Sequence, residues 1–195
     1  MLAMSMSAQS AIGHESPGND SRRSPSADEQ RQKIVTHRRA DPSVVLGIIS
    51  DTHGLLRPEA VEMLTGCDRI LHAGDVGIAA VLEELQQIAP VTAVRGNVDT
   101  APWARALPIA DVVEAGGVSI YILHDLAQLN LKPEAAGFGV VIYGHTHQPK
   151  TEQRNGVLYF NPGSAGPRRF RLPVSVGKLT IEAGQVHAEW AELKI

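Results

Sequence analysis

Continuous apolar runs, each followed by a short polar cluster, are the main pattern along this chain. Residues 44–49 read VVLGII and lead into a polar turn at residues 51–54, which is typical of a strand buried on both faces. The same pattern predicts further strands at residues 69–73, 91–94, 139–143 and 157–160.

Helices and hairpins are predicted between and after these strands. Residues 58–64 begin with a proline, which favours the first turn of a short helix, and residues 78–88 place four aliphatic side chains on one helical face. Apolar residues on both sides of Gly116 and Gly117 predict a hairpin at residues 112–123. Residues 174–193 alternate around a second glycine turn and predict a terminal hairpin.

The order of these elements places the chain in the α/β class. The first half alternates strand and helix, which implies a parallel sheet with helices on its faces. The second half is mostly strands, so we predict two packed sheets flanked by helices. Because ligands of open α/β sheets bind beyond the carboxyl ends of the strands, the polar clusters are expected to gather at one edge.

The segment before the first strand differs in composition from the rest of the chain. Residues 1–43 are rich in Ser, Pro and charged residues and contain little that a core could bury, so we predict a disordered N-terminal tail. Residues 44–195 are predicted to form one domain, because 195 residues with 43% hydrophobic content suffice for a single sizeable core.

Charge and cysteine content indicate which partners the protein can bind and in which cellular compartment it is expected. A net charge of −3 gives no sign of a nucleic-acid patch or of a basic membrane surface. No apolar run approaches the ~20 residues of a membrane span, and the N-terminus lacks the pattern of a secretory signal. Cys67 is the single cysteine, which suits a reducing compartment. We therefore predict a cytoplasmic protein without a nucleic-acid or membrane partner.

The polar clusters contain residue types that bind metal ions. Asp51 and His53 lie two positions apart in a tight turn, so both can point into one site, although an ordinary polar loop is an equally good interpretation. His145 and His147 have the same spacing after Gly144. Two imidazoles buried without partners would be costly, which favours metal ligation for the second pair.

Three further positions are ambiguous when each is taken singly. Asp75 follows a strand and a glycine, and its two carboxylate oxygens could bridge two ions, although a simple turn also explains it. Asn97 lies in a turn-prone Gly-Asn pair and can bind a metal through its amide oxygen. His124 ends an apolar strand, where a hydrogen-bonded core histidine is the alternative to a ligand.

The complete set carries more weight than its members. All seven side chains lie at predicted strand ends, and the spacing from His53 to Asp75 equals that from Asp75 to Asn97, at 22 residues each. Nitrogen and oxygen ligands without a thiolate suit Mn, Fe, Co, Ni or Zn. Seven ligands exceed what one tetrahedral ion needs, so we predict two divalent transition-metal ions, with Mn as the first choice.

In chain order, the motifs D-x-H, G-D, G-N-x-D, H and G-H-x-H resemble the calcineurin-like metallophosphoesterase superfamily. The short chain, the first strand and the Asn161-Pro-Gly-Ser164 segment are most similar to its YfcE-type branch of small phosphodiesterases. The resemblance implies a four-layer αββα sandwich of two mixed β-sheets flanked by helices. Relatives in this superfamily commonly dimerise, so a homodimer is also implied.

The family pattern divides the seven ligands between the two ions, with Asp75 as the bridge. The first ion would be held by Asp51, His53 and His147. The second would be held by Asn97, His124 and His145. Asn97 and His124 would also contact the substrate.

Many members of this superfamily have a histidine directly after the asparagine, where it contacts phosphate and can protonate the leaving group. This chain has Val98 there. Members of the YfcE-type branch often lack the histidine as well, so hydrolysis is still expected, and no catalytic side chain is assigned beyond a metal-bound hydroxide. Asp99 could support the site from behind the ligands or relay a proton weakly, and a turn cap is the alternative.

These features predict a metal-dependent phosphoesterase that acts on a small-molecule phosphoester, with a diester favoured over a monoester. A diester carries less negative charge, and an activated one needs little acid assistance. A phosphomonoesterase acting on a small metabolite stays open as an alternative. A non-catalytic scaffold, as in the retromer subunit of this fold, is a third hypothesis, although a scaffold has no need for all seven ligands.

Other polar residues near the clusters are interpreted as structural. His72 is predicted to be a packed histidine or a support behind the ligands, and Cys67 a small buried residue. Arg168 and Arg169 are interpreted as a solvated surface pair, with contact to a substrate phosphate as the alternative. Residues 101–108, which include Trp103, are a candidate wall of the pocket.

Overall fold

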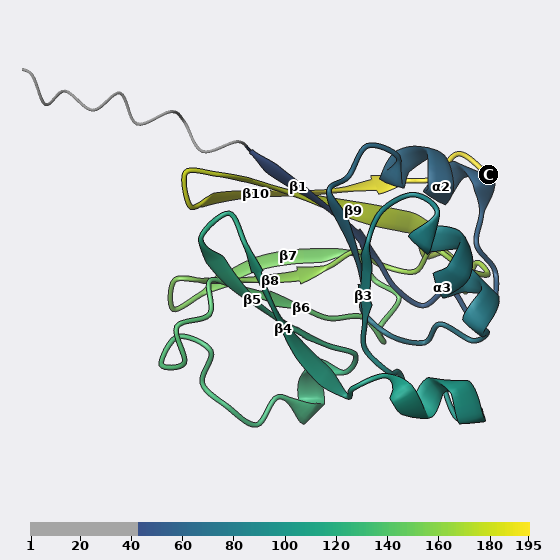
Figure 1. Cartoon of the computed structure of the whole chain (residues 1–195), viewed down its shortest axis with the longest axis horizontal. Coiled ribbons are helices and arrows are strands. Elements are labelled where there is room, and N and C mark those ends of the chain that lie inside the picture. Colours follow the sequence, from purple (N-terminus) through teal and green to yellow (C-terminus); the bar gives the residue numbers. More distant parts are fainter. Residues whose placement is uncertain (1–42) are drawn as a thin grey trace, which may run out of the picture. The chain divides into compact units, whose positions relative to one another are not determined.

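A computed structural model describes residues 43–195 of the chain. These residues form ten strands in two five-stranded sheets, together with two α-helices and two short 3-10 helices (Figure 1). The predicted disordered tail lies outside the described residues, apart from Ser43.

The first sheet joins the N-terminal strands to the C-terminal hairpin, in the order β10-β9-β1-β2-β3. Its strands are β1 (Val44–Ile49), β2 (Arg69–His72), β3 (Val91–Ala93), β9 (Ser175–Glu182) and β10 (Gln185–Glu192). β1, β2 and β3 run parallel, and Ile49, His72 and Ala93 lie side by side at their carboxyl ends. β9 is antiparallel to β1 and to β10.

The second sheet has the order β4-β5-β6-β8-β7. Its strands are β4 (Ala110–Ala115), β5 (Val118–Leu123), β6 (Val140–Ile142), β7 (Lys150–Arg154) and β8 (Val157–Asn161). β5, β6 and β8 are parallel, whereas the edge strands β4 and β7 are antiparallel to their neighbours. The prediction of two mixed sheets is therefore confirmed.

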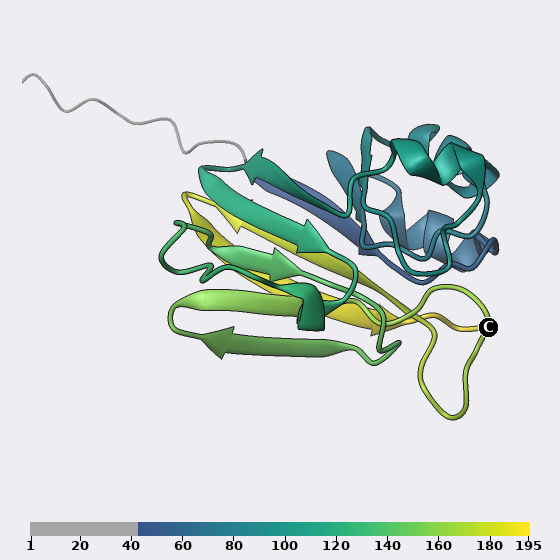
Figure 2. The ribbon, with the colours of Figure 1, turned by 90° about the horizontal axis from the view of Figure 1, so that it is seen from below.

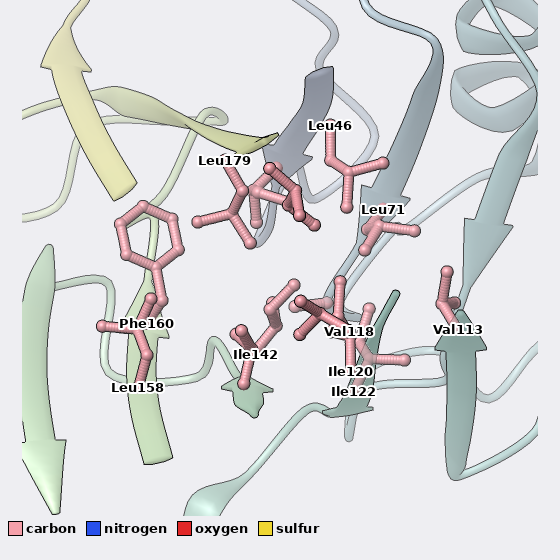
Figure 3. Packing of buried hydrophobic residues seen from close by; sticks show 14 of the residues in the cluster. Leu46, Leu71, Val113, Val118, Ile120, Ile122, Ile142, Leu158, Phe160 and Leu179 are labelled. Atoms are coloured by element: carbon pink, nitrogen blue, oxygen red, sulfur yellow. The ribbon is translucent and has the colours of Figure 1, made fainter. Parts of the chain in front are cut away.

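The main core lies between the two sheets (Figures 2 and 3). Alternation along the strands decides which side chains enter it, because successive residues of a strand point to opposite faces. In β8, Leu158 and Phe160 pack between the sheets, whereas Val157 and Tyr159 lie on the outer face of the second sheet. Both faces of β8 are buried, which explains why its residues 157–160 are apolar without interruption.

The two outer faces of the sandwich are covered unequally. The helices α2 (Pro58–Leu64) and α3 (Ala79–Gln86) pack on the first sheet through Leu64, Val81 and Leu85. The outer face of the second sheet carries η2 (Leu126–Gln128), a single 3-10 turn whose Leu126 packs against that sheet. The α/β sandwich is as predicted, with few helices around it.

Besides η2, two elements have no counterpart in the sequence prediction. β7 reads KTEQR and is mostly exposed at a sheet edge, so no hydrophobic alternation marks it. Its side chains pair with one another instead, with Lys150 and Arg154 each 2.8 Å from Glu152. η1 (Pro102–Ala106) is the other, and its Trp103 packs against the core beneath the helices. Trp103 therefore takes part in the core packing, and its place in a pocket wall stays a prediction.

The carboxyl ends of six parallel strands meet at one edge of the sandwich. β1, β2 and β3 bring their following loops there from the first sheet, and β5, β6 and β8 from the second. Every polar cluster singled out in the sequence follows one of these strands. Within residues 43–195, no helix has the length and apolarity that a membrane span requires.

Candidate metal centre

The turns that carry the candidate ligands have an unusual backbone conformation. Five of the seven ligands are non-glycine residues with a positive φ between 47° and 67°, namely Asp51, His53, Asp75, His145 and His147. This left-handed region is sterically unfavourable for residues with a Cβ atom, and such residues concentrate at functional sites.

Backbone hydrogen bonds hold the first two of these turns together. The Asp51 N–H donates to the carbonyl of Gly74, and the His53 N–H donates to the carbonyl of Asp75, both at 3.0 Å. The Gly54 N–H donates to the carbonyl of Val76 at 2.7 Å. Pairing between the two chain segments thus continues beyond β1 and β2 and fixes Asp51, His53 and Asp75 relative to one another.

Two glycines allow the other turns to approach closely. A Cβ atom at Gly96 would meet the backbone and carboxylate of Asp75. A Cβ atom at Gly144 would meet the Ser50 hydroxyl and would lie 2.8 Å from Oδ2 of Asp51. The glycines before Asn97 and His145 therefore let these ligands reach the cluster.

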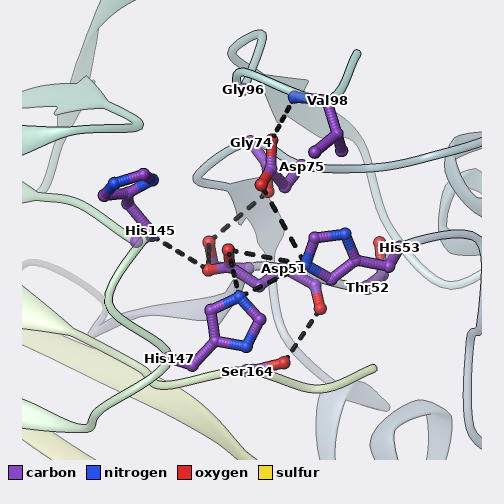
Figure 4. Close-up of polar contacts among 12 residues, drawn as sticks. Asp51, Thr52, His53, Gly74, Asp75, Gly96, Val98, His145, His147 and Ser164 are labelled. Carbon is purple, nitrogen blue, oxygen red and sulfur yellow. Dashed lines mark hydrogen bonds and ion pairs between the residues drawn. The ribbon is translucent and has the colours of Figure 1, made fainter. Parts of the chain in front are cut away.

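The first group of ligands contains Asp51, His53 and His147 (Figure 4). The Nε2 atoms of His53 and His147 are 3.2 Å apart, and Nε2 of His147 is also 3.2 Å from Oδ1 of Asp51. The two imidazole rings are stacked, with centroids 5.1 Å apart. Side chains from two distant turns thus direct three ligand atoms to one point.

The second group contains Asn97, His124 and His145. Oδ1 of Asn97 lies 3.1 Å from Nε2 of His124 and 3.0 Å from Nδ1 of His145. Oδ2 of Asp75 lies 3.3 Å from Nε2 of His124 and 4.0 Å from Nε2 of His53. Asp75 therefore lies between the two groups, where the resemblance places a bridging carboxylate.

The hydrogen bonds assign the tautomer of His124. Its Nδ1 lies 2.7 Å from the carbonyl of Ala73, which can only accept, so Nδ1 carries a proton. In the neutral ring, the Nε2 lone pair then faces the oxygen atoms of Asn97 and Asp75. Lone pairs that face one another repel unless a cation lies between them, and a histidine held through its other nitrogen is a typical metal ligand.

The burial of the carboxylates also fits metal ions. Asp51 is fully buried and Asp75 is 3% exposed, yet neither forms an ion pair with Lys or Arg within residues 43–195. Oδ1 of Asp51 and Nδ1 of His147 are buried without a hydrogen-bond partner in this part of the chain. Buried charges are normally paired or bound to metal, so the donor set suits divalent cations.

The side-chain charges shift the titration of the site in the metal-free protein. Burial lowers the pKa of His53, and the Arg169 guanidinium acts in the same direction against the nearby carboxylates. For His124, burial would lower the pKa, but the hydrogen bond to Asp75 and the carboxylate charges outweigh it and raise the pKa. For Asp75, burial opposes ionisation, but His124 and the Val98 N–H lower the pKa of the carboxyl.

Three residues that the sequence analysis did not assign to the site support its turns. The Ser50 hydroxyl donates to Oδ2 of Asp51 at 2.6 Å, and the Ser164 hydroxyl donates to the Asp51 carbonyl at 2.9 Å. The Asn161 amide donates to the carbonyl of Gly144 at 2.8 Å. Asn161 and Ser164 belong to the Asn-Pro-Gly-Ser segment, so the signal was present in the sequence, but it did not specify a role.

Asp99 lies behind the ligands and binds backbone amides. Its Oδ2 accepts from the N–H groups of Gly96 at 2.8 Å and Val76 at 3.1 Å, and its Oδ1 accepts from Gly77 at 2.8 Å. These bonds tie the loop after β3 to the loop after β2. Asp99 is only 4% exposed, and its carboxylate accepts the hydrogen bonds that hold the turn.

His72 is a fully buried neighbour of the site. The Gly74 N–H donates to its Nδ1 at 3.2 Å, so the ring proton lies on Nε2 and is directed at the Thr52 hydroxyl, 2.9 Å away. The Thr52 hydroxyl in turn donates to the carbonyl of Val76 at 2.9 Å. Burial lowers the pKa of His72 to about 4, so the ring is neutral near pH 7.

The two arginines after the Asn-Pro-Gly-Ser segment lie in different surroundings. Nη2 of Arg168 is 3.8 Å from a carboxylate oxygen of Glu192, on the exposed surface. Nη2 of Arg169 is 3.4 Å from Nε2 of His53. Both arginines are exposed, as predicted, and Arg169 in addition reaches a candidate ligand. Cys67 is buried, as predicted.

Fold and ligand geometry together are those of a metal-binding α/β sandwich, and comparison with known proteins gives the family. The calcineurin-like phosphoesterase superfamily domain matches residues 44–184. The chain belongs to this superfamily.

Relatives with assigned names are metallophosphoesterases and phosphodiesterases. A probable metallophosphoesterase of Methanocaldococcus jannaschii is 34% identical over 154 residues, which cover 72% of this chain and 77% of the relative. Phosphodiesterase YfcE of Escherichia coli is 36% identical over 114 residues, which cover 52% of this chain and 59% of YfcE.

Solved structures share the fold. An archaeal phosphodiesterase superposes with a TM-score of 0.64 at 26% identity, covering 76% of this chain and all of that protein. Vacuolar protein sorting 29 of Cryptosporidium parvum superposes with a TM-score of 0.63 at 21% identity, covering 77% of this chain and 98% of that protein. The second likeness concerns the fold alone.

Proposed function

We propose that this protein is a phosphodiesterase that uses two divalent transition-metal ions, with Mn as the first choice. The first ion would be bound by Asp51, His53 and His147. The second would be bound by Asn97, His124 and His145. Asp75 would contact both.

One observation supports this proposal above the others: nitrogen and oxygen ligand atoms from distant turns converge on two points. Nε2 of His124 faces two oxygens, and Nε2 of His147 faces both another imidazole nitrogen and Oδ1 of Asp51. These imidazole nitrogens and the carboxylate and amide oxygens carry lone pairs that a cation can accept. Cations bound between these atoms would remove the repulsion between their lone pairs. The number of ligand atoms suits two such cations.

When bound, two such ions polarise phosphoryl oxygens and acidify a water molecule, which is the chemistry that phosphoester hydrolysis needs. The protein residues would orient these groups. Oδ1 of Asp75 is fixed by the N–H of Val98 at 2.9 Å, which leaves Oδ2 directed at both ligand groups. The exposed edge of the site, formed by Asn97 and His145, would receive the substrate phosphate.

The position after Asn97 supports a preference for diesters with good leaving groups. Val98 is 42% exposed at the site and has no proton to donate from its side chain. Asp99 cannot replace the missing acid, since three backbone amides occupy its carboxylate. A leaving group would therefore depart without assistance from a protein acid, which favours stable anions such as aryl oxides.

The test is hydrolysis by protein that has been stripped with a chelator and then loaded with Mn²⁺. We expect bis-p-nitrophenyl phosphate to be cleaved faster than p-nitrophenyl phosphate, and activity to disappear when the chelator is added again. Faster cleavage of the monoester would favour the phosphomonoesterase. Tight Mn²⁺ binding without any hydrolysis, or no Mn²⁺ binding at all, would contradict the proposal and favour the scaffold. The cytoplasmic location and the homodimer stay predictions.

A further inference from the structure

Arg168 and Arg169 are adjacent in the chain, but only one of them is charge-compensated. Arg168 is paired with Glu192, and both of these side chains extend into solvent. Arg169 has no carboxylate within 4.0 Å in residues 43–195, and its guanidinium contacts Nε2 of His53 instead. A permanent cation thus lies beside an atom of the proposed metal centre.

The contact of Arg169 with His53 is incompatible with metal ligation by the same nitrogen. Nε2 cannot direct its lone pair both at a guanidinium N–H and at a metal ion. In the metal-loaded protein the guanidinium would therefore lose this acceptor while lying next to a further positive charge. An anion between the two cations would restore the balance, and a guanidinium binds phosphate oxygens through two parallel hydrogen bonds.

A hollow of about 190 Å³ adjoins the guanidinium. It is lined by His145, Thr146, His147, Arg169, Phe170 and Leu172. The hollow connects the ligand turn after β6 with the loop between β8 and β9, which extends beyond the strand ends in Figure 2. A group attached to a phosphate at the metal centre could enter it directly.

Phe170 is placed at this hollow by a tight turn. The Leu172 N–H donates to the carbonyl of Arg169 at 3.1 Å, and Phe170 within this turn has a φ of 53°. Phe170 is 94% exposed, so neither burial nor a favourable backbone conformation accounts for an aromatic residue here. An exposed aromatic ring beside an anion site is suited to stack on a planar group of a ligand.

We propose that Arg169 and Phe170 form a substrate-binding pair that selects phosphodiesters with a planar ester group. Arg169 binds a non-bridging oxygen of the phosphate, and Phe170 stacks on an aromatic or nucleobase-like ester group held in the hollow. This inference rests on the proposed function, because it requires the metal centre to hold the phosphate. It adds the substrate class that the metal ligands by themselves do not define.

Binding measurements test the pair without relying on turnover. The Mn²⁺-loaded protein is titrated by calorimetry with inorganic phosphate and with diphenyl phosphate, an aryl diester with poor leaving groups. Arg169→Gln is expected to weaken the binding of both by about 10- to 100-fold, because a hydrogen bond to a charged group is lost. Arg168→Gln is the matched control and should change neither affinity by more than about twofold, as for an exposed pair.

The same two probes distinguish the contribution of Phe170 to binding from that of Arg169. Phe170→Asn keeps a residue that tolerates a positive φ while removing the ring. We expect diphenyl phosphate to bind about 10-fold more weakly and inorganic phosphate to bind as in the wild type, because only the diester has a ring to stack. Thermal unfolding of each variant verifies that these exposed substitutions leave the fold intact.

The outcomes separate this inference from the proposed function. Two bound Mn²⁺ ions, Arg169-dependent phosphate binding and no hydrolysis would refute the phosphodiesterase but support the binding pair. Hydrolysis of the diester, together with equal phosphate affinities of Arg168→Gln and Arg169→Gln, would support the phosphodiesterase but refute the binding pair. A wild type that binds neither probe, or a Phe170→Asn variant that binds diphenyl phosphate normally, would overturn the pair.

Discussion

The two ends of the sandwich use the same left-handed backbone conformation for different purposes. At the end opposite the metal centre, Gly117, Gly156 and Gly184 lie in hairpin turns with φ between 77° and 82°, and a Cβ atom at any of them would meet nothing within 4 Å. At the ligand end, the conformation is adopted by Asp and His residues, and the neighbouring Gly96 and Gly144 are tightly enclosed.

The difference shows that the backbone preference of a residue type is followed in the hairpin turns and overridden at the ligand turns. At the hairpin end, glycines and Asn155 adopt the conformation that their residue type favours, and Ala183, with a φ of 48°, is the exception. At the ligand end, each non-glycine residue with positive φ costs on the order of 1–3 kcal/mol, which surrounding hydrogen bonds must offset. Backbone bonds between the turns after β1 and β2, together with Ser50, Ser164 and Asp99, provide that support.

Among exchanges at residues with positive φ, Asp51→Asn at the ligand end should cause the largest loss of activity. The exchange removes a ligand charge but keeps a side chain that tolerates positive φ. We expect kcat/KM with Mn²⁺ to fall about 10³-fold or more, because several kcal/mol of metal-dependent transition-state stabilisation is lost. The stabilisation of thermal unfolding by Mn²⁺ should become smaller, whereas metal-free stability should be maintained.

The matched control for this variant is Asn155→Asp, the reverse exchange at an exposed hairpin residue that also has positive φ. It should leave activity and the response to Mn²⁺ as in the wild type. Comparable losses in both variants would mean that the ligand end is not chemically distinct from the hairpin end.

Glycine substitutions sharpen the comparison in terms of stability. Gly144→Ala places a methyl group against Ser50 and Asp51, so we expect a loss of about 3 kcal/mol in the free energy of unfolding, as for overpacking. Gly184→Ala meets no neighbour, and only its backbone conformation opposes the substitution, so about 1 kcal/mol should be lost. Urea unfolding measures both values, and equal losses would refute the tight packing behind the metal centre.

The pH dependence of stability tests the buried network at the ligand end. Because the pKa of His72 falls from 6.5 to about 4 on folding, the unfolded chain binds the proton first. Stability is therefore complete above the unfolded pKa and decreases as the pH falls from 6.5 toward 4. The loss attributable to His72 between pH 7 and 5 is about 2 kcal/mol.

His72→Gln cannot take up this proton, yet it can still donate to Thr52. In chelator, its free energy of unfolding should decrease less than that of the wild type between pH 7 and 5, by about the same 2 kcal/mol. Parallel curves for the two proteins would mean that His72 is protonated in the folded state.

Hydrophobic pattern was enough to predict the fold class and most strands. The uninterrupted apolar runs of β1, β6 and β8 predict strands because both of their faces are buried. β7 was not predicted because an exposed edge strand needs no apolar alternation. η1 and η2 were not predicted because such short helices leave no periodic signal in the sequence. Such elements depend on tertiary contacts that local pattern does not contain.

The site was predictable as a set of residue types, but its geometry was not. Strand-end positions were enough to propose that seven ligands meet. The sequence could not reveal that five of them have positive φ, since Asp and His rarely do, nor that Asn161 and Ser164 hold the turns from behind. Arg169 was indistinguishable from Arg168 in sequence, because only the fold decides which guanidinium faces His53.

The central claim is that two metal ions share the bridging Asp75, and a crystal structure of the Mn²⁺-loaded protein with phosphate tests it most directly. Anomalous scattering at the manganese edge should give two peaks on either side of Asp75, one near Asp51, the other near Asn97. A single peak, or none among these residues at saturating Mn²⁺, would contradict the claim.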